Sequence, residues 1–126
     1  MNLESPKVTI QKSSTELFEY LSKMENFEKL MPENIEKFEA DGDTFTFTLK
    51  GMPEIKLQLQ EQEAPKKIVL GSASSQFPFT LITSIDSLSE SESDLQFHFN
   101  GKFNPMVAMM IKKPLQKFIN TMADNL

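Results

Sequence analysis

The sequence predicts an α+β fold in which a curved antiparallel sheet wraps around one long C-terminal helix. Five stretches that alternate polar and apolar residues run from about Phe38 to Phe103, and such alternation is typical of strands with one wet and one dry face. A single helical pattern, Pro105 to Asn125, then ends the sequence with an apolar stripe. A sheet followed by one amphipathic helix favours a cavity for small apolar ligands between the two.

Length and composition predict a single domain over residues 1–126. A chain of 126 residues buries about two-thirds of its unfolded surface, which is enough for a stable core without disulfides or structural metals. The chain has no cysteine, which excludes disulfides and thiolate metal sites and suits a reducing cytoplasm. The start, Met1 to Ile10, lacks a signal pattern, and the longest apolar-rich run, Met106 to Ile111, is far shorter than the roughly 20 residues of a membrane span. We therefore expect a soluble, cytoplasmic protein without integral membrane association.

The charge pattern argues against nucleic acid as a partner. Thirteen basic and eighteen acidic residues give a net charge of -5, and every basic residue is a lysine. Arginine is the usual bidentate partner for phosphate and for guanine edges, so its absence from an acidic chain weighs against nucleic-acid binding. The four glycines are scattered singly, so neither a P-loop nor a dinucleotide fingerprint is present. We expect no nucleic acid and no cofactor.

The N-terminal third predicts one strand and two short helices. Lys7 to Ile10 is a strand candidate with two β-branched residues on one face. Ser13 and Glu16 have the spacing of a capping box at a helix start. A second short helical turn carries Phe27, and Pro32 ends it. Two short helices in succession are expected to brace the sheet.

Strict alternation identifies the clearest of the later strands. The apolar members of three strands are Phe45, Phe47 and Leu49; Ile55, Leu57 and Leu59; and Leu95, Phe97 and Phe99. Lys67 to Ser72 and Phe79 to Ile85 complete the set. The turns between the strands are expected at Asp41-Gly42, Gly51-Met52-Pro53, Ala64-Pro65 and Ser87 to Asp94. These short links predict an antiparallel meander.

The terminal helix shows an apolar stripe when it is laid out at 100° per residue. The stripe contains Val107, Ile111, Leu115, Phe118 and Met122, with Ile119 at its edge. Met106 and Met109 fall outside it; we expect them to pack under a neighbouring loop, with a portal or a dimer contact as alternatives. Pro114 removes one helical hydrogen bond and is expected to kink the helix. Lys112, Lys113 and Lys117 form a basic patch on the outer face, suited to an anionic lipid surface or an acidic partner, although a solvated helix face explains them as well.

Several of these segments carry a family resemblance. The segments are Leu17 to Leu21, Phe27 to Pro32, Asp41-Gly42-Asp43, Phe103-Asn104-Pro105-Met106 and Lys113-Pro114-Leu115. Together they resemble the small bacterial members of the SRPBCC superfamily, the START-like or Bet v 1-like helix-grip proteins, over nearly the whole chain. The resemblance implies a strand, two short helices, six further strands and a long C-terminal helix, with an apolar cavity between sheet and helix. The superfamily contains lipid and sterol carriers, polyketide cyclases and co-chaperones, so the fold alone does not select a function.

The inward faces of these elements give the candidate ligand-binding residues. The expected cavity walls are Phe45, Phe47, Leu57, Leu59, Phe79, Leu81, Phe97 and Phe99, and the expected helical lid is Val107, Met110, Ile111 and Phe118. Aromatic rings and mobile methionine side chains adapt to flat or flexible apolar molecules. The competing interpretation is a plain core that the eleven phenylalanines simply fill.

Polar candidates are few. His98, the single histidine, lies on the wet parity of its strand and is expected at the surface. Glu61 and Thr83 have inward parity, and Asn104 stands at the corner between strand and helix, so each is a candidate for orienting a ligand. A buried Glu61 would act as an acid, but its place near a strand end favours exposure.

Three functions follow as hypotheses. The first is a cofactor-free protein, a monomer or weak homodimer, that binds or carries a small hydrophobic molecule such as a lipid, sterol or polyketide. The second is an enzyme of the cyclase or dehydratase type that uses the same cavity, which requires an inward acid or base. The third is a protein-interaction module resembling the co-chaperones, acting through the surface of Met106 and Met109.

Overall fold

A computed structural model describes residues 1–52, 54–73 and 78–126 of the chain. Two short strands, an α-helix and a 3-10 helix come first: β1 (Asn2–Glu4), β2 (Val8–Ile10), α1 (Ser14–Leu21) and η1 (Met24–Leu30). Six strands and a long helix follow: β3 (Ile35–Asp41), β4 (Thr44–Leu49), β5 (Ile55–Glu63), β6 (Lys67–Ser72), β7 (Phe79–Ser87), β8 (Ser93–Gly101) and α2 (Pro105–Asp124). The fold is therefore α+β, as the sequence predicts.

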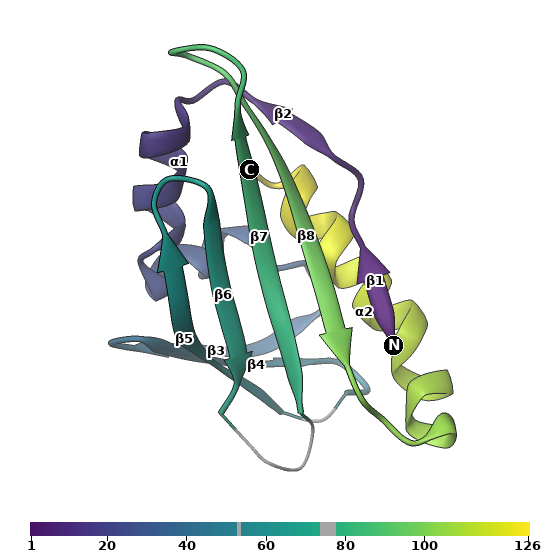
Figure 1. Ribbon diagram of the computed structural model, residues 1–126. Coiled ribbons are helices and arrows are strands. Elements are labelled where there is room, and N and C mark those ends of the chain that lie inside the picture. Colours follow the sequence, from purple (N-terminus) through teal and green to yellow (C-terminus); the bar gives the residue numbers. More distant parts are fainter. Residues whose placement is uncertain (53, 74–77) are drawn as a thin grey trace.

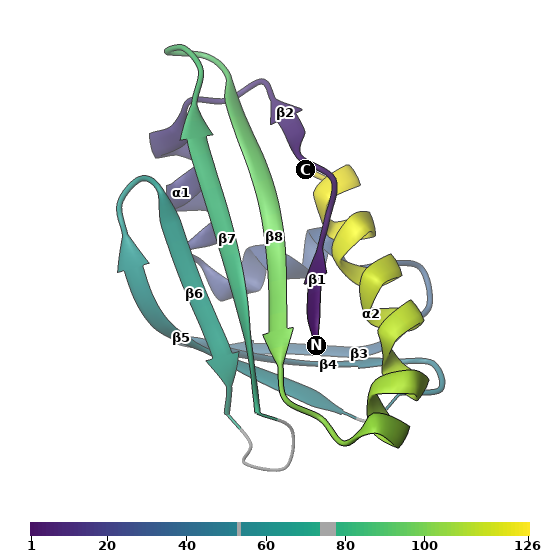
Figure 2. The ribbon, with the colours of Figure 1, turned by 45° about the vertical axis from the view of Figure 1, so that its right-hand side comes forward.

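The strands form one antiparallel sheet in the order β1, β8, β7, β6, β5, β4, β3, and β2 also pairs with β8. In Figure 1 the strands β6 to β8 run nearly upright while β3 and β4 run across the lower part of the molecule, so the sheet is strongly curled. The helix α2 lies within the curl, beside β1 and β8, and Figure 2 shows this arrangement from a second side. This is the helix-grip arrangement.

The first helix begins where the capping pattern predicts. The hydroxyl of Ser13 accepts a hydrogen bond from the backbone N–H of Glu16 at 3.2 Å, which satisfies one of the free donors of the first turn. The following 3-10 helix buries Met24, Phe27 and Leu30. Both short helices therefore contribute apolar side chains to the core, and the prediction of a bracing pair is confirmed.

The six strands that the family resemblance implies after the short helices are present as β3 to β8. Alternation alone predicts the five strands β4 to β8, and one strand, β1, was not predicted. The predicted N-terminal strand corresponds to β2, but β1 precedes it and pairs with β8, with Leu3 opposite Phe99. A three-residue strand with a single apolar residue has too little alternation to be recognised from sequence. The expected turn at Gly51-Met52-Pro53 includes Pro53, which lies outside the described residues.

The long helix begins at a well-formed cap. The side chain of Asn104 accepts a hydrogen bond from the backbone N–H of Val107 at 2.9 Å, and Pro105 occupies the first helical turn, where its missing donor costs nothing. The helix continues through Pro114. Its buried side chains begin at Ile111. No helix among the described residues is long and apolar enough to cross a membrane.

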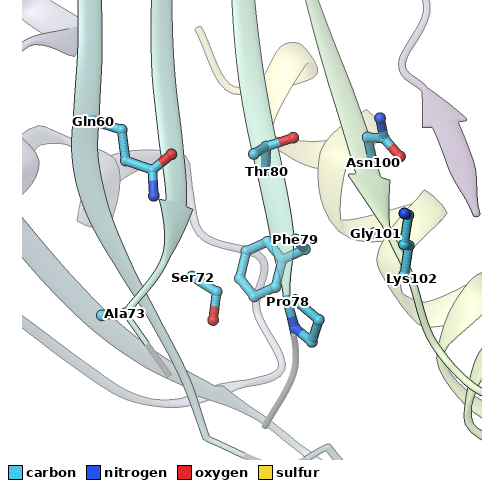
Figure 3. A pocket seen from close by; sticks show the side chains of 9 residues that line it. All are labelled: Gln60, Ser72, Ala73, Pro78, Phe79, Thr80, Asn100, Gly101 and Lys102. Atoms are coloured by element: carbon cyan, nitrogen blue, oxygen red, sulfur yellow. The ribbon is translucent and has the colours of Figure 1, made fainter. Parts of the chain in front are cut away.

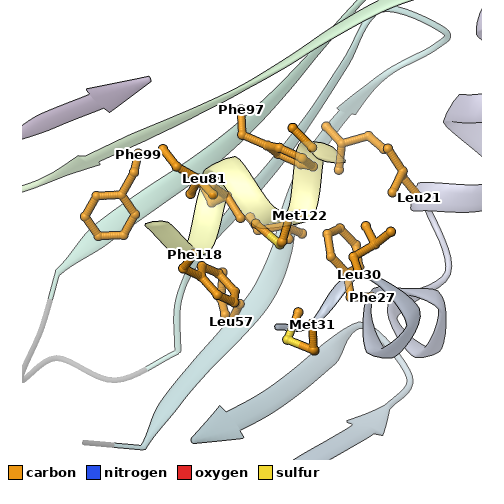
Figure 4. Packing of buried hydrophobic residues seen from close by; sticks show 14 of the residues in the cluster. Leu21, Phe27, Leu30, Met31, Leu57, Leu81, Phe97, Phe99, Phe118 and Met122 are labelled. Atoms are coloured by element: carbon orange, nitrogen blue, oxygen red, sulfur yellow. The ribbon is translucent and has the colours of Figure 1, made fainter. Parts of the chain in front are cut away.

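The core is rich in phenylalanine and lies between the sheet, the short helices and the second half of α2 (Figure 4). Phe27 of η1 stacks on Phe45 of β4 with ring centroids 4.9 Å apart. Phe47 of β4 stacks on Phe118 of α2 at 4.6 Å. Stacked rings thus connect β4 to both a short helix and the long one, and they fill much of the space that the curl encloses.

Candidate ligand-binding site

Two small apolar hollows lie between the sheet and α2. The inner hollow is lined by Phe47, Ile55, Leu57, Phe79, Leu81, Phe99, Leu115, Phe118 and Ile119. The outer hollow, nearer the first half of α2, is lined by Met52, Ile55, Phe79, Phe99, Phe103, Ile111 and Leu115. Four residues belong to both linings, so the two hollows adjoin. We call the outer hollow the mouth of the grip.

Both hollows are too small for an organic ligand in this conformation. The inner hollow has a volume of about 10 Å³ and the mouth about 30 Å³, whereas one water already requires roughly 10–15 Å³. Stacked rings occupy the remaining space: Phe79 lies 5.1 Å from Phe99, and Phe99 lies 6.2 Å from Phe103, centroid to centroid. In this structure these side chains therefore pack as a core around two small hollows.

The linings contain many of the residues expected to form the cavity. Seven of them border one or both hollows, namely Phe47, Leu57, Phe79, Leu81, Phe99, Ile111 and Phe118. Phe45 borders neither hollow and instead stacks on the rings of Phe27 and Phe38. Phe97 is buried but borders neither hollow, and Leu59 and Val107 are only partly buried. The structure thus brings seven of the twelve expected residues to the hollows and places the other five elsewhere.

The expected position of Met110 in the lid is wrong. Its side chain is 71% exposed, because successive helical residues are 100° apart and burial of Ile111 turns Met110 away from the sheet. The expectation that Met106 and Met109 pack under a loop is also wrong, since they are 74% and 83% exposed. The first two turns of α2 therefore present three methionines to solvent.

Several lining residues were not anticipated as cavity walls. Met52 and Phe103 lie outside regular strands, where alternation assigns no inward or outward direction. Ile55 has the same parity as Leu57, so its inward direction follows from the sequence, although it was not assigned to the cavity. Leu115 and Ile119 belong to the predicted apolar stripe or its edge. The stripe alone does not separate residues that line a cavity from residues that pack on the sheet.

One polar group is buried without a partner. Thr83 of β7 is fully buried, and its Oγ1 forms no hydrogen bond with any described residue. Its neighbours across the sheet are Ile68 of β6 and Phe97 of β8, so its surroundings are apolar. The inward direction predicted for Thr83 is confirmed, but it borders neither hollow.

The other polar candidates lie at the surface. Glu61 is exposed because the pairing of β5 with β6 shifts register between Leu59 and Glu61, and such a bulge reverses the face of the residues after it. His98 is about one-third exposed, with its Nδ1 3.6 Å from the Oε1 of Glu4. Asn104 is occupied in capping α2. No group of three or more metal-ligating side chains occurs in the described part of the chain.

The larger depressions lie on the outside of the molecule and are open. One of about 580 Å³ is lined by Gln60, Ser72, Ala73, Pro78, Phe79, Thr80, Asn100, Gly101 and Lys102 (Figure 3). Another, of about 680 Å³, lies beside α1 and includes Tyr20, with the Nζ of Lys12 4.8 Å from the centre of its ring. Both linings include polar and ionisable residues, unlike those of the apolar hollows under α2.

Comparison with known proteins identifies the fold. No protein-family model matches the chain, and no curated protein sequence matches it. Solved structures do match. A norcoclaurine synthase point mutant from Thalictrum flavum, in complex with a transition-state analogue, has a TM-score of 0.73 at 12% identity over 99% of this chain and 90% of that one.

Two bacterial structures have similar scores. A START superfamily protein from Mycobacterium smegmatis has a TM-score of 0.68 at 14% identity, over 98% of this chain and 94% of its own. A conserved protein from Geobacillus kaustophilus has a TM-score of 0.68 at 11% identity, over 99% and 91%. The chain therefore has the helix-grip fold of START-like and Bet v 1-like proteins, as the sequence resemblance implies. At these identities the likeness concerns the fold alone.

Proposed function

We propose that this protein binds and carries a small hydrophobic molecule, such as a lipid, sterol or polyketide-like compound, between its sheet and α2. The observation that carries the proposal is the mouth of the grip, whose lining residues are all apolar. The ligand enters there and displaces the first half of α2 from the sheet. Because the chain has no cysteine, the proposed location is the cytoplasm.

The attachment of α2 favours opening at this end. Side-chain hydrogen bonds hold its second half: Gln116 Nε2 donates to the carbonyl of Glu4 at 2.7 Å, and Asn125 Nδ2, just past the helix, donates to the carbonyl of Leu30 at 3.1 Å. In the first half of α2, Ile111 is the one buried residue, whereas the other five buried residues of the helix all lie in the second half. Displacing the first half therefore breaks fewer contacts than displacing the second.

Desolvation supplies the affinity. A ligand that buries about 300 Å² of apolar surface gains about 7 kcal/mol before ordering costs are subtracted. Since the lining residues of both hollows include no ionisable side chain, acid–base catalysis is not part of the proposal. Flexible Met52 and the aromatic rings adapt their shape to the ligand rather than selecting one polar group.

The test is native mass spectrometry of gently purified protein, followed by titration with fatty acids, sterols and polyketides. We expect an extra mass of one ligand per chain, present in the native spectrum and absent after denaturation. A spectrum without extra mass that stays unchanged across the whole panel would contradict the proposal.

A pair of isoleucine variants locates the site. Ile55→Phe adds volume to a residue that borders both hollows, so we expect weaker ligand binding. Ile82→Phe makes the same change on β7 at a partly exposed position, between the buried Leu81 and Thr83, whose side chains point to the opposite face. Binding should be unchanged in that control. Equal losses in both variants would place the ligand elsewhere.

A second candidate function is that of a protein-interaction module resembling the co-chaperones, which binds a protein partner through the surface of Met106 and Met109. It is favoured by their exposure, which is higher than that of any other large apolar side chain among the described residues. Replacing both residues by lysine should then abolish capture of the protein partner without unfolding the domain. Intact capture in that variant would exclude this function.

A further inference from the structure

The exposed side of α2 changes character along its length. Met106, Met109 and Met110, which we call the methionine face, are 74%, 83% and 71% exposed. At 100° per residue, Met106 and Met110 share an arc of about 60° with Lys113 and Lys117. This arc is opposite the stripe that packs on the sheet. One solvent-facing stripe about 16 Å long therefore begins with methionine and ends with lysine.

The charge around this stripe is the reverse of that of the whole chain. Residues 101–123 contain four lysines and no acidic residue, giving +4 in a chain of net charge -5, so the remaining residues carry -9. Lys102, Lys112, Lys113 and Lys117 are all exposed, and none forms an ion pair with a described residue. The basic charge is therefore concentrated beside the methionine face and is available to a partner.

We propose that this surface docks onto an anionic lipid bilayer, with the methionine face entering the interface and the lysines contacting lipid phosphates. A helix with an apolar segment beside lysines, and with no acidic residue before its last one, Asp124, has the composition of an interfacial helix. Long lysine side chains extend toward headgroups while their stems stay on the apolar side. Screening over about 8 Å at physiological salt keeps the distant acidic residues from cancelling this attraction.

The residue types favour lipid over a protein partner. Protein interfaces draw most of their affinity from Trp, Tyr and Arg. The chain has no Trp and no Arg, and its single tyrosine is Tyr20, at the depression beside α1. Unbranched, flexible methionines instead suit a fluid acyl region. A second copy of the chain is disfavoured because the surface would place lysines against lysines.

Docking goes beyond ligand binding and does not require it. The surface lies at the end of the molecule where the first turns of α2 emerge, at the lower right in Figures 1 and 2, while α1 lies at the opposite upper left. Phe103 and Ile111, which line the mouth, flank the methionine face in sequence. The mouth and the methionine face therefore belong to the same end of α2, with Ile111 on its sheet side and the methionine face on its solvent side.

Vesicle sedimentation tests the proposal. The full chain should bind vesicles of phosphatidylglycerol and phosphatidylcholine about a hundredfold more tightly than vesicles of phosphatidylcholine alone, because three surface lysines contribute about fivefold each. The triple variant Lys112→Gln, Lys113→Gln, Lys117→Gln should lose most of this preference. Absence of binding to anionic vesicles, or equal binding to neutral ones, overturns the proposal.

Two further triple variants separate insertion from general attraction. Met106→Gln, Met109→Gln, Met110→Gln keeps helix propensity and should weaken binding about tenfold or more, since it removes the apolar area that inserts. Lys7→Gln, Lys23→Gln, Lys66→Gln removes the same charge from exposed lysines elsewhere and should change binding little. Full binding by the methionine variant, or an equal loss in the lysine control, overturns docking through this surface.

Single tryptophans report insertion directly, because the chain contains no tryptophan of its own. Met109→Trp should show blue-shifted emission on anionic vesicles and quenching by lipids with brominated acyl chains. Leu88→Trp replaces an exposed residue in the turn between β7 and β8 and should show neither change. A response from both probes, or from neither, overturns insertion at the methionine face. The proposal is also overturned if the protein forms a dimer without lipid and the methionine-to-glutamine variant is a monomer.

Discussion

The ring of Phe47 on β4 lies nearly parallel to the ring of Phe118 on α2, with centroids 4.6 Å apart and planes 11° apart. Both side chains are almost fully buried. This stack fixes the second half of the long helix against the sheet and fills the inner hollow from both sides.

Removing one ring of this stack should destabilise and open the core. Phe118→Ala is expected to lower the free energy of unfolding by about 3–5 kcal/mol, through lost burial and the cavity left behind. Phe118→Leu, which keeps most of the apolar volume, should cost less. Urea denaturation measures both values.

The cavity left by Phe118→Ala gives a second measurement. It would be apolar on all sides, and such cavities stay dry and take up benzene-sized molecules. Benzene should therefore raise the Tm of Phe118→Ala more than that of the wild type. Equal shifts would mean that the surrounding side chains collapse into the space.

The buried hydroxyl of Thr83 should be a stability defect. Thr83→Val replaces an Oγ1 that lacks a hydrogen-bond partner among the described residues with a methyl group of similar size. The free energy of unfolding should rise by about 1 kcal/mol, because a desolvated polar atom is removed. Thr83→Ser, which keeps the hydroxyl and deletes the methyl, should lower it. A less stable valine variant would show that the hydroxyl is satisfied in solution.

Two glycines on the sheet should respond differently to alanine. A Cβ at Gly101 would meet Cε2 of Phe103 at 2.5 Å and Cβ of Phe79 at 3.0 Å, so Gly101→Ala forces aside rings that line the mouth. We expect a loss of about 1–3 kcal/mol. At Gly71 the three atoms nearest to an added Cβ all belong to the side chain of Gln60, which is flexible and moves away, so Gly71→Ala should be nearly neutral. Thermal unfolding compares the two, and similar Tm values would contradict the ranking.

The cap of α2 should govern the first turns of the helix. Asn104→Ala removes the acceptor for the N–H of Val107 and should cost about 1 kcal/mol, whereas Asn104→Asp keeps an acceptor and most of the stability. Hydrogen exchange should speed up at residues 106–110 and stay slow at residues 115–123, where the helix is buried. Uniform acceleration along the helix would mean that α2 opens as one unit.

Regular alternation accounts for the parts of the fold that the sequence predicts well. Phe45, Phe47 and Leu49 are all buried, as are Leu95, Phe97 and Phe99, because neither strand interrupts its period of two. In β5 the register shift after Leu59 makes the parity of Glu61 uninformative. A bulge depends on the pairing partner, so one strand's own sequence does not reveal it.

The candidate site was harder to predict than the fold. Parity assigns a face to Phe97 or Phe45 but gives no distance to α2, so it does not separate residues at the hollows from those packed elsewhere. Met52 and Phe103 line the mouth from irregular segments, where no period applies. The outward position of Met110 agrees with the apolar stripe of the sequence, which contains Ile111 but not Met110, so assigning both residues to the lid was inconsistent with helical geometry.

The pairing of the first strands with β8 constrains how the chain reaches this structure. The N–H of Phe97 donates to the hydroxyl of Ser5, a residue 92 positions earlier, and both β1 and β2 have β8 as their partner. During synthesis β1 and β2 remain unpaired until β8 has been made and has left the ribosome. Contacts so distant along the chain make folding slow and leave early intermediates prone to association. The protein should therefore depend more on chaperones while it is made than its small size suggests.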